Sequence, residues 1–193
     1  MKLDDQQFRN YCELSYSILQ CYKDIAILNY FEMLGKDKTP FLPEVIEVVN
    51  HVTILAQKDL ALTIWKIKLD NNPNANTVSK FRNKIKYELK KEGLSVSSEK
   101  KTMLDKELEN DLKRMRSQFL AHIDMYRNDG RIEIHKLKKA LDVICKEFNS
   151  VCNKIDDDRV HEITDSNKME IDICMITGMS LLFKSQYSAE TNK

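Results

Sequence analysis

An arginine and a histidine stand six residues apart in a segment whose composition favours a long helix. The segment runs Arg114-Met-Arg-Ser-Gln-Phe-Leu-Ala-His122-Ile-Asp124, and the two residues are Arg116 and His122. Because an imidazole titrates near neutral pH, His122 can give and take protons at cell pH. A guanidinium is a permanently charged planar donor that suits phosphate oxygens, which is a role for Arg116 with Arg114 in reserve. Asp124 is close enough in sequence to orient the imidazole. These residue types predict phosphate chemistry that needs no metal and no cofactor.

The spacing of the two residues limits how one helix can use them. On an ideal helix Arg116 and His122 lie about 240° apart around the axis and about 9 Å apart along it, so they do not share a face. A site made of both needs either a distortion of the helix or a second copy of the chain. A symmetric dimer brings the same patch of both chains together and doubles the arginines and histidines. We therefore expect a homodimer.

The same histidine also has a structural interpretation. Residues of one helical stripe recur at alternating steps of three and four: Leu112, Met115, Phe119, His122 and Tyr126. A single imidazole on such a stripe is usually a core residue whose hydrogen bonds are satisfied. The alternative to catalysis is therefore a non-catalytic helical dimer that binds RNA or a protein partner.

The motif resembles that of the HEPN family of all-helical domains, many of which are ribonuclease toxins. Leu120-Ala-His-Ile-Asp124 is similar to the L-A-H-x-D form of the abortive-infection U-type branch of that family. The resemblance implies an HEPN-like fold, a toxin or phage-defence ribonuclease, an active cleft between two protomers, RNA as substrate and an antitoxin protein as partner. It also implies a regulatory tyrosine shortly after the histidine, for which Tyr126 is the candidate.

If the site is catalytic, the expected reaction is RNA cleavage by the adjacent ribose. The 2′-hydroxyl attacks the phosphate and leaves a cyclic phosphate end, while His122 moves the proton and Arg116 stabilises the developing charge. DNA lacks this hydroxyl and is expected to be refused.

A second candidate for RNA contact is the basic run between residues 80 and 91. It interleaves lysines with two aromatic residues, and we expect Arg82 and Lys84 to bind phosphate. A solvated helix face is the alternative interpretation.

Composition limits the class of protein. The 193 residues include 4 glycines and 3 prolines, with 32% charged and 42% hydrophobic residues, which favours amphipathic helices over a sheet. The net charge of +1 means that any RNA binding must be local. No apolar run is long enough to span a bilayer and no signal peptide is recognised, so we expect no membrane contact and a cytoplasmic location. Five cysteines without a close C-x-x-C pair indicate buried free thiols, and residues 156–158 indicate a solvated acidic loop rather than a metal site.

The periodicity predicts an all-α, elongated antiparallel bundle of five to six helices. The whole chain, 1–193, is expected to form one HEPN-like domain, with 155–193 either part of the bundle or a C-terminal helical extension. Thr77 or Asn76 is expected to cap the third helix, Gly93 to end it, and Ser98 to cap the fourth. The expected helices cover residues 4–34, as one long helix or two nearly continuous ones, and residues 43–69, 77–92, 99–126, 134–154 and 169–183.

Overall fold

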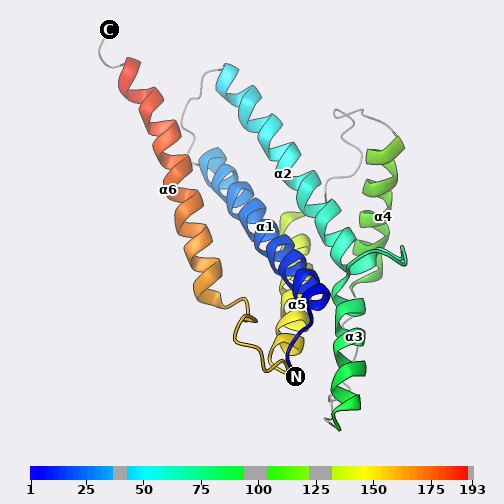
Figure 1. The fold of residues 1–193 in the computed structure, drawn as a ribbon. Helices are drawn as coiled ribbons and strands as arrows, with labels where there is room; N and C mark the ends of the chain where they lie inside the picture. Colours follow the sequence, from blue (N-terminus) through cyan, green and yellow to red (C-terminus); the bar gives the residue numbers. More distant parts are fainter. Residues whose placement is uncertain (37–42, 94–103, 122–131, 191–193) are drawn as a thin grey trace.

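Six helices make up the part of the chain that can be described. The structure is a computed structural model, and it describes residues 1–36, 43–93, 104–121 and 132–190. No strand occurs in these ranges, so the predicted all-α class is confirmed. The helices are α1 (Asp5–Lys36), α2 (Pro43–Leu69), α3 (Val78–Lys91), α4 (Lys106–Ala121), α5 (Ile134–Cys152) and α6 (Asp165–Glu190), shown in Figure 1.

Helix α1 is the central element of the bundle. It packs against α2 and α6, and it also contacts α5 and α3. Helix α2 runs antiparallel to α1, whereas α6 runs in the same direction as α1 (Figure 1). Helix α4 packs on α2, and it lies at the edge of the bundle opposite to α6 (Figure 1). Helix α4, which carries Arg114 and Arg116, is therefore supported by α2 rather than by the central helix.

The core is a continuous cluster of aliphatic and aromatic side chains. Each buried Leu, Ile or Phe stabilises the folded state by roughly 1.5–3 kcal/mol relative to exposure. An aromatic group joins three helices, because the ring of Phe148 on α5 lies 5.7 Å from Tyr11 on α1 and 6.2 Å from Phe81 on α3. The largest fully buried side chains are Phe81, Phe148, Leu14, Ile18, Leu28, Leu60, Ile64, Ile67, Ile85, Leu112, Leu137 and Leu141.

Both ends of α3 follow the sequence signals. The side chain of Thr77 accepts a hydrogen bond of 3.2 Å from the backbone N–H of Lys80, which confirms the predicted cap. Gly93 follows the helix with a φ of 74°, a left-handed conformation that favours glycine. Its N–H donates to the carbonyl oxygen of Lys90 at 3.1 Å, so the predicted stop is also confirmed.

The start of α4 differs from the expectation. We expected a helix from residue 99 with Ser98 as its cap, but residues 104–105 are not helical and α4 begins at Lys106. The carboxylate of Asp105 accepts the N–H of Glu107 at 2.8 Å and so caps the helix at this point. The predicted continuous helix is therefore wrong, while Ser98 itself lies outside the described residues.

The acidic segment before α6 has a structural role. Asp157 is buried, and its carboxylate accepts the N–H of Leu3 at 3.0 Å and the guanidinium of Arg159 at 2.8 Å. Hydrogen bonds from Arg159 and from Leu3 hold the pKa of Asp157 below its usual value. The prediction of a solvated acidic loop is wrong for Asp157, which ties the start of the chain to the segment that precedes α6.

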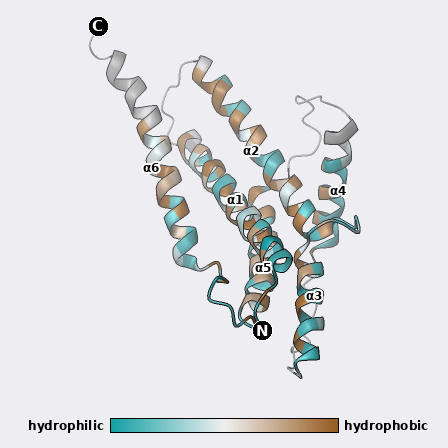
Figure 2. Cartoon of the chain, in the orientation of Figure 1, coloured by the Kyte–Doolittle hydropathy of each residue, from teal (hydrophilic) through white to brown (hydrophobic). Residues whose placement is uncertain are grey.

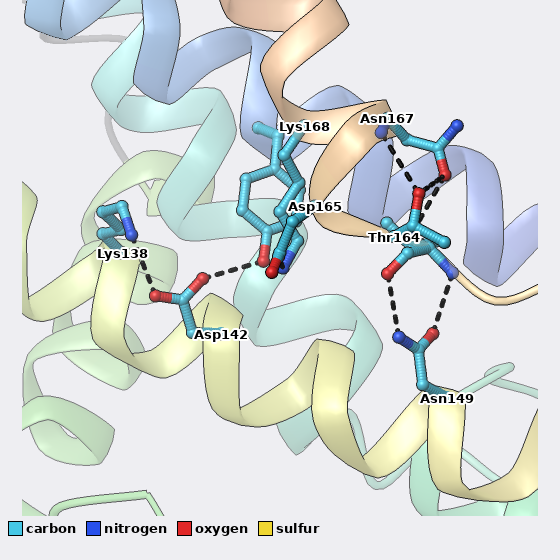
Figure 3. Close-up of polar contacts among 9 residues, drawn as sticks. Lys138, Asp142, Asn149, Thr164, Asp165, Asn167 and Lys168 are labelled. Atoms are coloured by element: carbon cyan, nitrogen blue, oxygen red, sulfur yellow. Dashed lines mark hydrogen bonds and ion pairs between the residues drawn. The ribbon is translucent and has the colours of Figure 1, made fainter.

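Helix α6 begins earlier than expected, at Asp165 rather than 169, because polar contacts hold its start (Figure 3). The side-chain amide of Asn149 donates to the carbonyl of Ile163 at 2.8 Å and accepts its N–H at 3.0 Å. Thr164 then caps the helix by accepting the N–H of Asn167 at 3.3 Å.

A second set of contacts in Figure 3 joins α6 to α1 and α5. The ammonium of Lys168 lies 5.1 Å from the centre of the Tyr22 ring. The hydroxyl of Tyr22 donates to Asp142 at 2.8 Å, and Lys138 binds the other oxygen of that carboxylate at 3.0 Å. Burial raises the pKa of Tyr22, so its hydroxyl stays protonated and remains a donor.

Hydropathy is mixed along the helices (Figure 2). None of the helices in the described ranges combines the length and the apolar character that crossing a bilayer requires.

All five cysteines are free thiols. Cys21, Cys145 and Cys152 are buried, as predicted, whereas Cys12 and Cys174 are exposed.

Candidate active site on α4

Arg116 lies on the exposed side of α4 and stacks on an aromatic ring. Its guanidinium carbon is 4.1 Å from the centre of the Trp65 ring, which belongs to α2. The tryptophan is half-buried and packs against the core, so the platform under the guanidinium is held by the fold. Arg116 borders the apolar stripe of α4, since Leu112 one turn earlier is buried and Met115 is half-buried. The helix thus buries its apolar stripe and presents Arg116 to solvent beside α2.

The two arginines of the motif have different electrostatic partners. The guanidinium of Arg114 lies 3.0 Å from the carboxylate of Asp111, one turn earlier on the same helix. No carboxylate in the described ranges forms an ion pair with Arg116. An exposed ion pair contributes at most about 1 kcal/mol, yet it lowers the attraction of Arg114 for a phosphate. Arg116 is therefore the better placed of the two cations to bind an anion from solution.

Ser117, which follows Arg116, forms a hydrogen bond within α4. The hydroxyl of Ser117 donates to the backbone carbonyl of Arg114 at 2.8 Å, a bond within the helix.

Three residues of the predicted site follow the end of the described part of α4. His122, Asp124 and Tyr126 lie outside the described residues, which end at Ala121 on this side of the gap.

The predicted phosphate-binding residues of α3 divide into two kinds. Arg82 is mostly buried, with 18% of its side chain exposed, and its guanidinium lies 3.0 Å from Glu147 of α5. Glu147 also binds Lys68 at the end of α2, and both of these side chains are only 3% exposed. Arg82 is thus part of a buried ion cluster, which we define as Lys68, Arg82 and Glu147. Lys84 is exposed and forms no ion pair with any described residue.

The predicted phosphate-binding residues lie on two different helices, α3 and α4. Helices α3 and α4 extend in opposite directions from the level of the α2–α3 loop (Figure 1). The candidate contacts on α3 and Arg116 on α4 therefore belong to two helices that diverge.

Sequence reasoning missed three residues that the structure singles out. Trp65 is the single tryptophan of the chain, and its rarity was the available signal. Lys68 and Glu147 gave no signal, because a charged residue on a mixed helix is normally solvated and its burial depends on which helix packs over it.

Asp24 was missed as well. It is buried on α1, where it interrupts the apolar spacing of Cys21, Ile25 and Leu28. One of its carboxylate oxygens has no hydrogen-bond partner among the described residues. Burial, followed by the negative charge of Asp59, raises the pKa of Asp24 to about 7.

No group of three or more His, Cys, Asp or Glu side chains in the described ranges is arranged to hold a metal ion. No family model, curated protein or solved structure matches the chain.

Proposed function

We propose that the protein is a metal-independent endoribonuclease of the toxin or phage-defence type, which acts as a homodimer. The proposal is supported most by Arg116, whose guanidinium is exposed, stacked on Trp65, and free of any carboxylate of the described ranges. A cation in this state can accept a phosphate without first giving up a protein partner. His122 follows it by six residues, and the resemblance of this segment to the HEPN motif supplies the reaction.

In the proposed reaction the 2′-hydroxyl of one ribose attacks the neighbouring phosphorus. His122 takes the hydroxyl proton or gives a proton to the leaving 5′-oxygen, and the products are a 2′,3′-cyclic phosphate and a 5′-hydroxyl. Arg116 binds the phosphate oxygens and stabilises the charge that builds up in the transition state. Asp124 orients the imidazole of His122.

The proposed site takes its arginine from one chain and its histidine from the other. Arg116 and His122 point about 240° apart on a regular helix, so a single straight α4 cannot direct both at one phosphate. Two copies related by a two-fold axis can.

The test is cleavage of single-stranded RNA in excess chelator. We expect cyclic phosphate ends with the wild-type protein and no cleavage with His122→Ala. Arg116→Ala should lower the rate by about 10²–10³-fold, the usual effect of removing one transition-state donor. Arg114→Ala is the matched control, and it should lower the rate less than tenfold because Arg114 is already paired with Asp111. Equal cleavage by wild type and His122→Ala, or none by either in a dimeric sample, would contradict the proposal.

Mixing two inactive variants tests the shared site. When Arg116→Ala and His122→Ala chains are combined, a mixed dimer holds one site with both residues intact. Activity should therefore return on mixing if the site is composite. If each chain supplies its own pair, mixing will restore nothing.

One observation favours the second candidate, a non-catalytic dimer that binds RNA or a protein partner. Leu112 and Met115 begin the stripe to which position 122 belongs, and these two side chains face the core. A buried His122 would be structural. In that event His122→Ala lowers the free energy of unfolding, while the wild-type protein leaves RNA intact.

A further inference from the structure

The solvent side of α3 combines lysines with an exposed aromatic ring. Its buried side consists of Val78, Phe81, Ile85 and Leu89. On an ideal helix Tyr87 points within about 20° of the direction opposite to that side. Its side chain is 62% exposed. We define the α3 outer face by five of the exposed residues of the helix, which are Lys84, Lys86, Tyr87, Lys90 and Lys91.

Two cations of α3 form contacts within the fold. Lys80 donates to the backbone carbonyls of Asp70 and Asn72, and Arg82 is held by Glu147 in the buried ion cluster. These two cations stabilise the turn before α3 and its packing on α5. They are not available to a ligand unless those contacts break.

The remaining cations of the α3 outer face are available. Lys84, Lys86 and Lys90 form no ion pair with the described residues, and all three are exposed. Lys91 already has two partners on the same helix, because its ammonium lies 3.1 Å from Glu88 and 4.4 Å from the centre of the Tyr87 ring. Since two lysines flank Tyr87 on each side around the helix, the ring lies in the middle of a positive surface.

The charge of this helix differs from that of the whole chain. Residues 80–91 carry six cations and one acid, a net charge of +5, whereas the complete chain has a net charge of +1. The remainder is therefore acidic overall, with a net charge of −4. A polyanion approaching the protein is therefore attracted to α3 more than to the remainder of the chain as a whole.

We propose that the α3 outer face binds the backbone of single-stranded RNA, with a base stacked on Tyr87. Phosphate neutralisation by lysines combined with stacking on an aromatic side chain is the general chemistry of single-strand binding. The choice of RNA rests on the proposed function, whereas the polyanion-binding character rests on charge, exposure and geometry. Because α3 and α4 extend in opposite directions (Figure 1), this surface holds RNA at a distance from Arg116 and takes no part in the chemical step.

The experiment measures affinity of the wild-type protein for an uncleavable RNA, a single strand with 2′-fluoro in place of 2′-hydroxyl groups, over a range of salt concentrations. The test variant is Lys84→Gln/Lys86→Gln/Lys90→Gln. Each lysine that neutralises a phosphate contributes about 0.7 to the slope of log affinity against log salt for a single strand. We expect the slope to fall by about 2 and the affinity at low salt to fall at least tenfold.

The matched control removes the same charge elsewhere. Lys139, Lys146 and Lys154 are exposed on or just after α5 and form no ion pair with the described residues. The triple change of these lysines to glutamine should leave the slope and most of the affinity unchanged. An equal loss with both triple variants would overturn the proposal, because it would show an effect of net charge alone.

A second variant tests the stacking without changing the charge. Tyr87→Ala should weaken RNA binding about tenfold, and Tyr87→Phe should restore it. Equal binding by Tyr87→Ala and wild type excludes the stacked base. Since all these side chains are exposed, thermal unfolding of each variant should match that of wild type and so verify folding.

Two further measurements separate this inference from the proposed function. In cleavage assays the α3 triple variant should raise KM and leave kcat unchanged, because the proposed catalytic residue Arg116 lies on α4 and not on α3. If RNA is bound through α3 but never cleaved, the proposed function fails and the binding surface stands. If the same lysines bind anionic vesicles and the uncleavable RNA is not bound, the binding surface is excluded whatever the outcome of the cleavage assay.

Discussion

Arg82 and Arg116 differ in what their guanidinium groups contact. Arg82 on α3 points inward to Glu147, which also holds Lys68, and the three form a buried ion cluster between α2, α3 and α5. Arg116 on α4 lies outward on the ring of Trp65 and has no carboxylate partner in the described ranges. The first guanidinium is needed to neutralise a buried charge, while the second is left for a ligand.

The difference shows why a positive charge alone does not identify a binding residue. A buried carboxylate loses its hydration and must be compensated by cations, so Glu147 holds Arg82 and Lys68 strongly. An aromatic ring attracts a guanidinium by only about 0.5–1 kcal/mol at an exposed site and leaves its hydrogen-bond donors free. Trp65 can therefore position Arg116 without saturating it.

The largest expected effect comes from breaking the buried ion cluster. Glu147→Gln leaves Lys68 buried without an opposite charge and should lower the free energy of unfolding by about 3–5 kcal/mol. Urea unfolding measures this loss. Glu13→Gln is the matched control, because Glu13 pairs with Lys66 at 3.3 Å while both side chains are half exposed. Its cost should stay below about 1 kcal/mol. Similar costs for the two variants would mean that Glu147 is solvated in solution.

A smaller effect concerns the buried acid Asp24, one of whose carboxylate oxygens has no hydrogen-bond partner among the described residues. The pKa of Asp24 is raised to about 7 by burial and by Asp59, so the folded protein keeps this proton at a pH where the unfolded chain has lost it. The free energy of unfolding should therefore fall as the pH rises from about 4 to about 7, by at most about 1.4 kcal/mol per pH unit. Asp24→Asn should remove this slope in urea unfolding curves recorded across that range.

The pKa of Asp157 is shifted in the opposite direction to that of Asp24. Its pKa is lowered by Arg159 and Leu3, so its contribution to stability is lost only as the pH falls below the usual range of an aspartate. The two acids therefore act in different pH windows. A wild-type protein whose stability does not change between pH 4 and pH 7 would contradict the account of Asp24.

The smallest expected effect concerns the contact that positions Arg116. A double-mutant cycle with Trp65→Leu and Arg116→Gln should give a coupling energy of about 0.5–1 kcal/mol in urea unfolding. Trp65→Phe keeps an aromatic face and should retain most of the coupling. The same cycle with Arg114→Gln should give none, since Arg114 pairs with Asp111 instead. Equal coupling to both arginines would remove the special position of Arg116.

Much of the fold could be predicted from the sequence because its signals are local. Helix α2 has the expected ends at residues 43 and 69, and Thr77 and Gly93 bound α3 as expected. The start of α4 was misplaced because a run of charged residues suits a helix wherever it begins. Only the structure distinguishes Asp105 as the residue whose carboxylate caps it.

For the candidate site, the sequence put Arg116 first and Arg114 in reserve, but it gave no difference in their surroundings. Their difference depends on Asp111 and Trp65, and the second of these comes from another helix. In the same way Arg82 and Lys84 were equivalent as members of a basic run. The packing of α3 against α5 separates them, because it places Glu147 beside Arg82.

By itself the sequence determined the helical class, the ends of α2 and α3 and the presence of an arginine and a histidine six residues apart, because propensity, periodicity and capping act over a few neighbouring residues. Tertiary structure alone decided which charges are buried and which are left in solvent. That outcome depends on the helix that packs over each side chain, and residues distant in the chain, such as Lys68 and Glu147, meet only when the bundle forms.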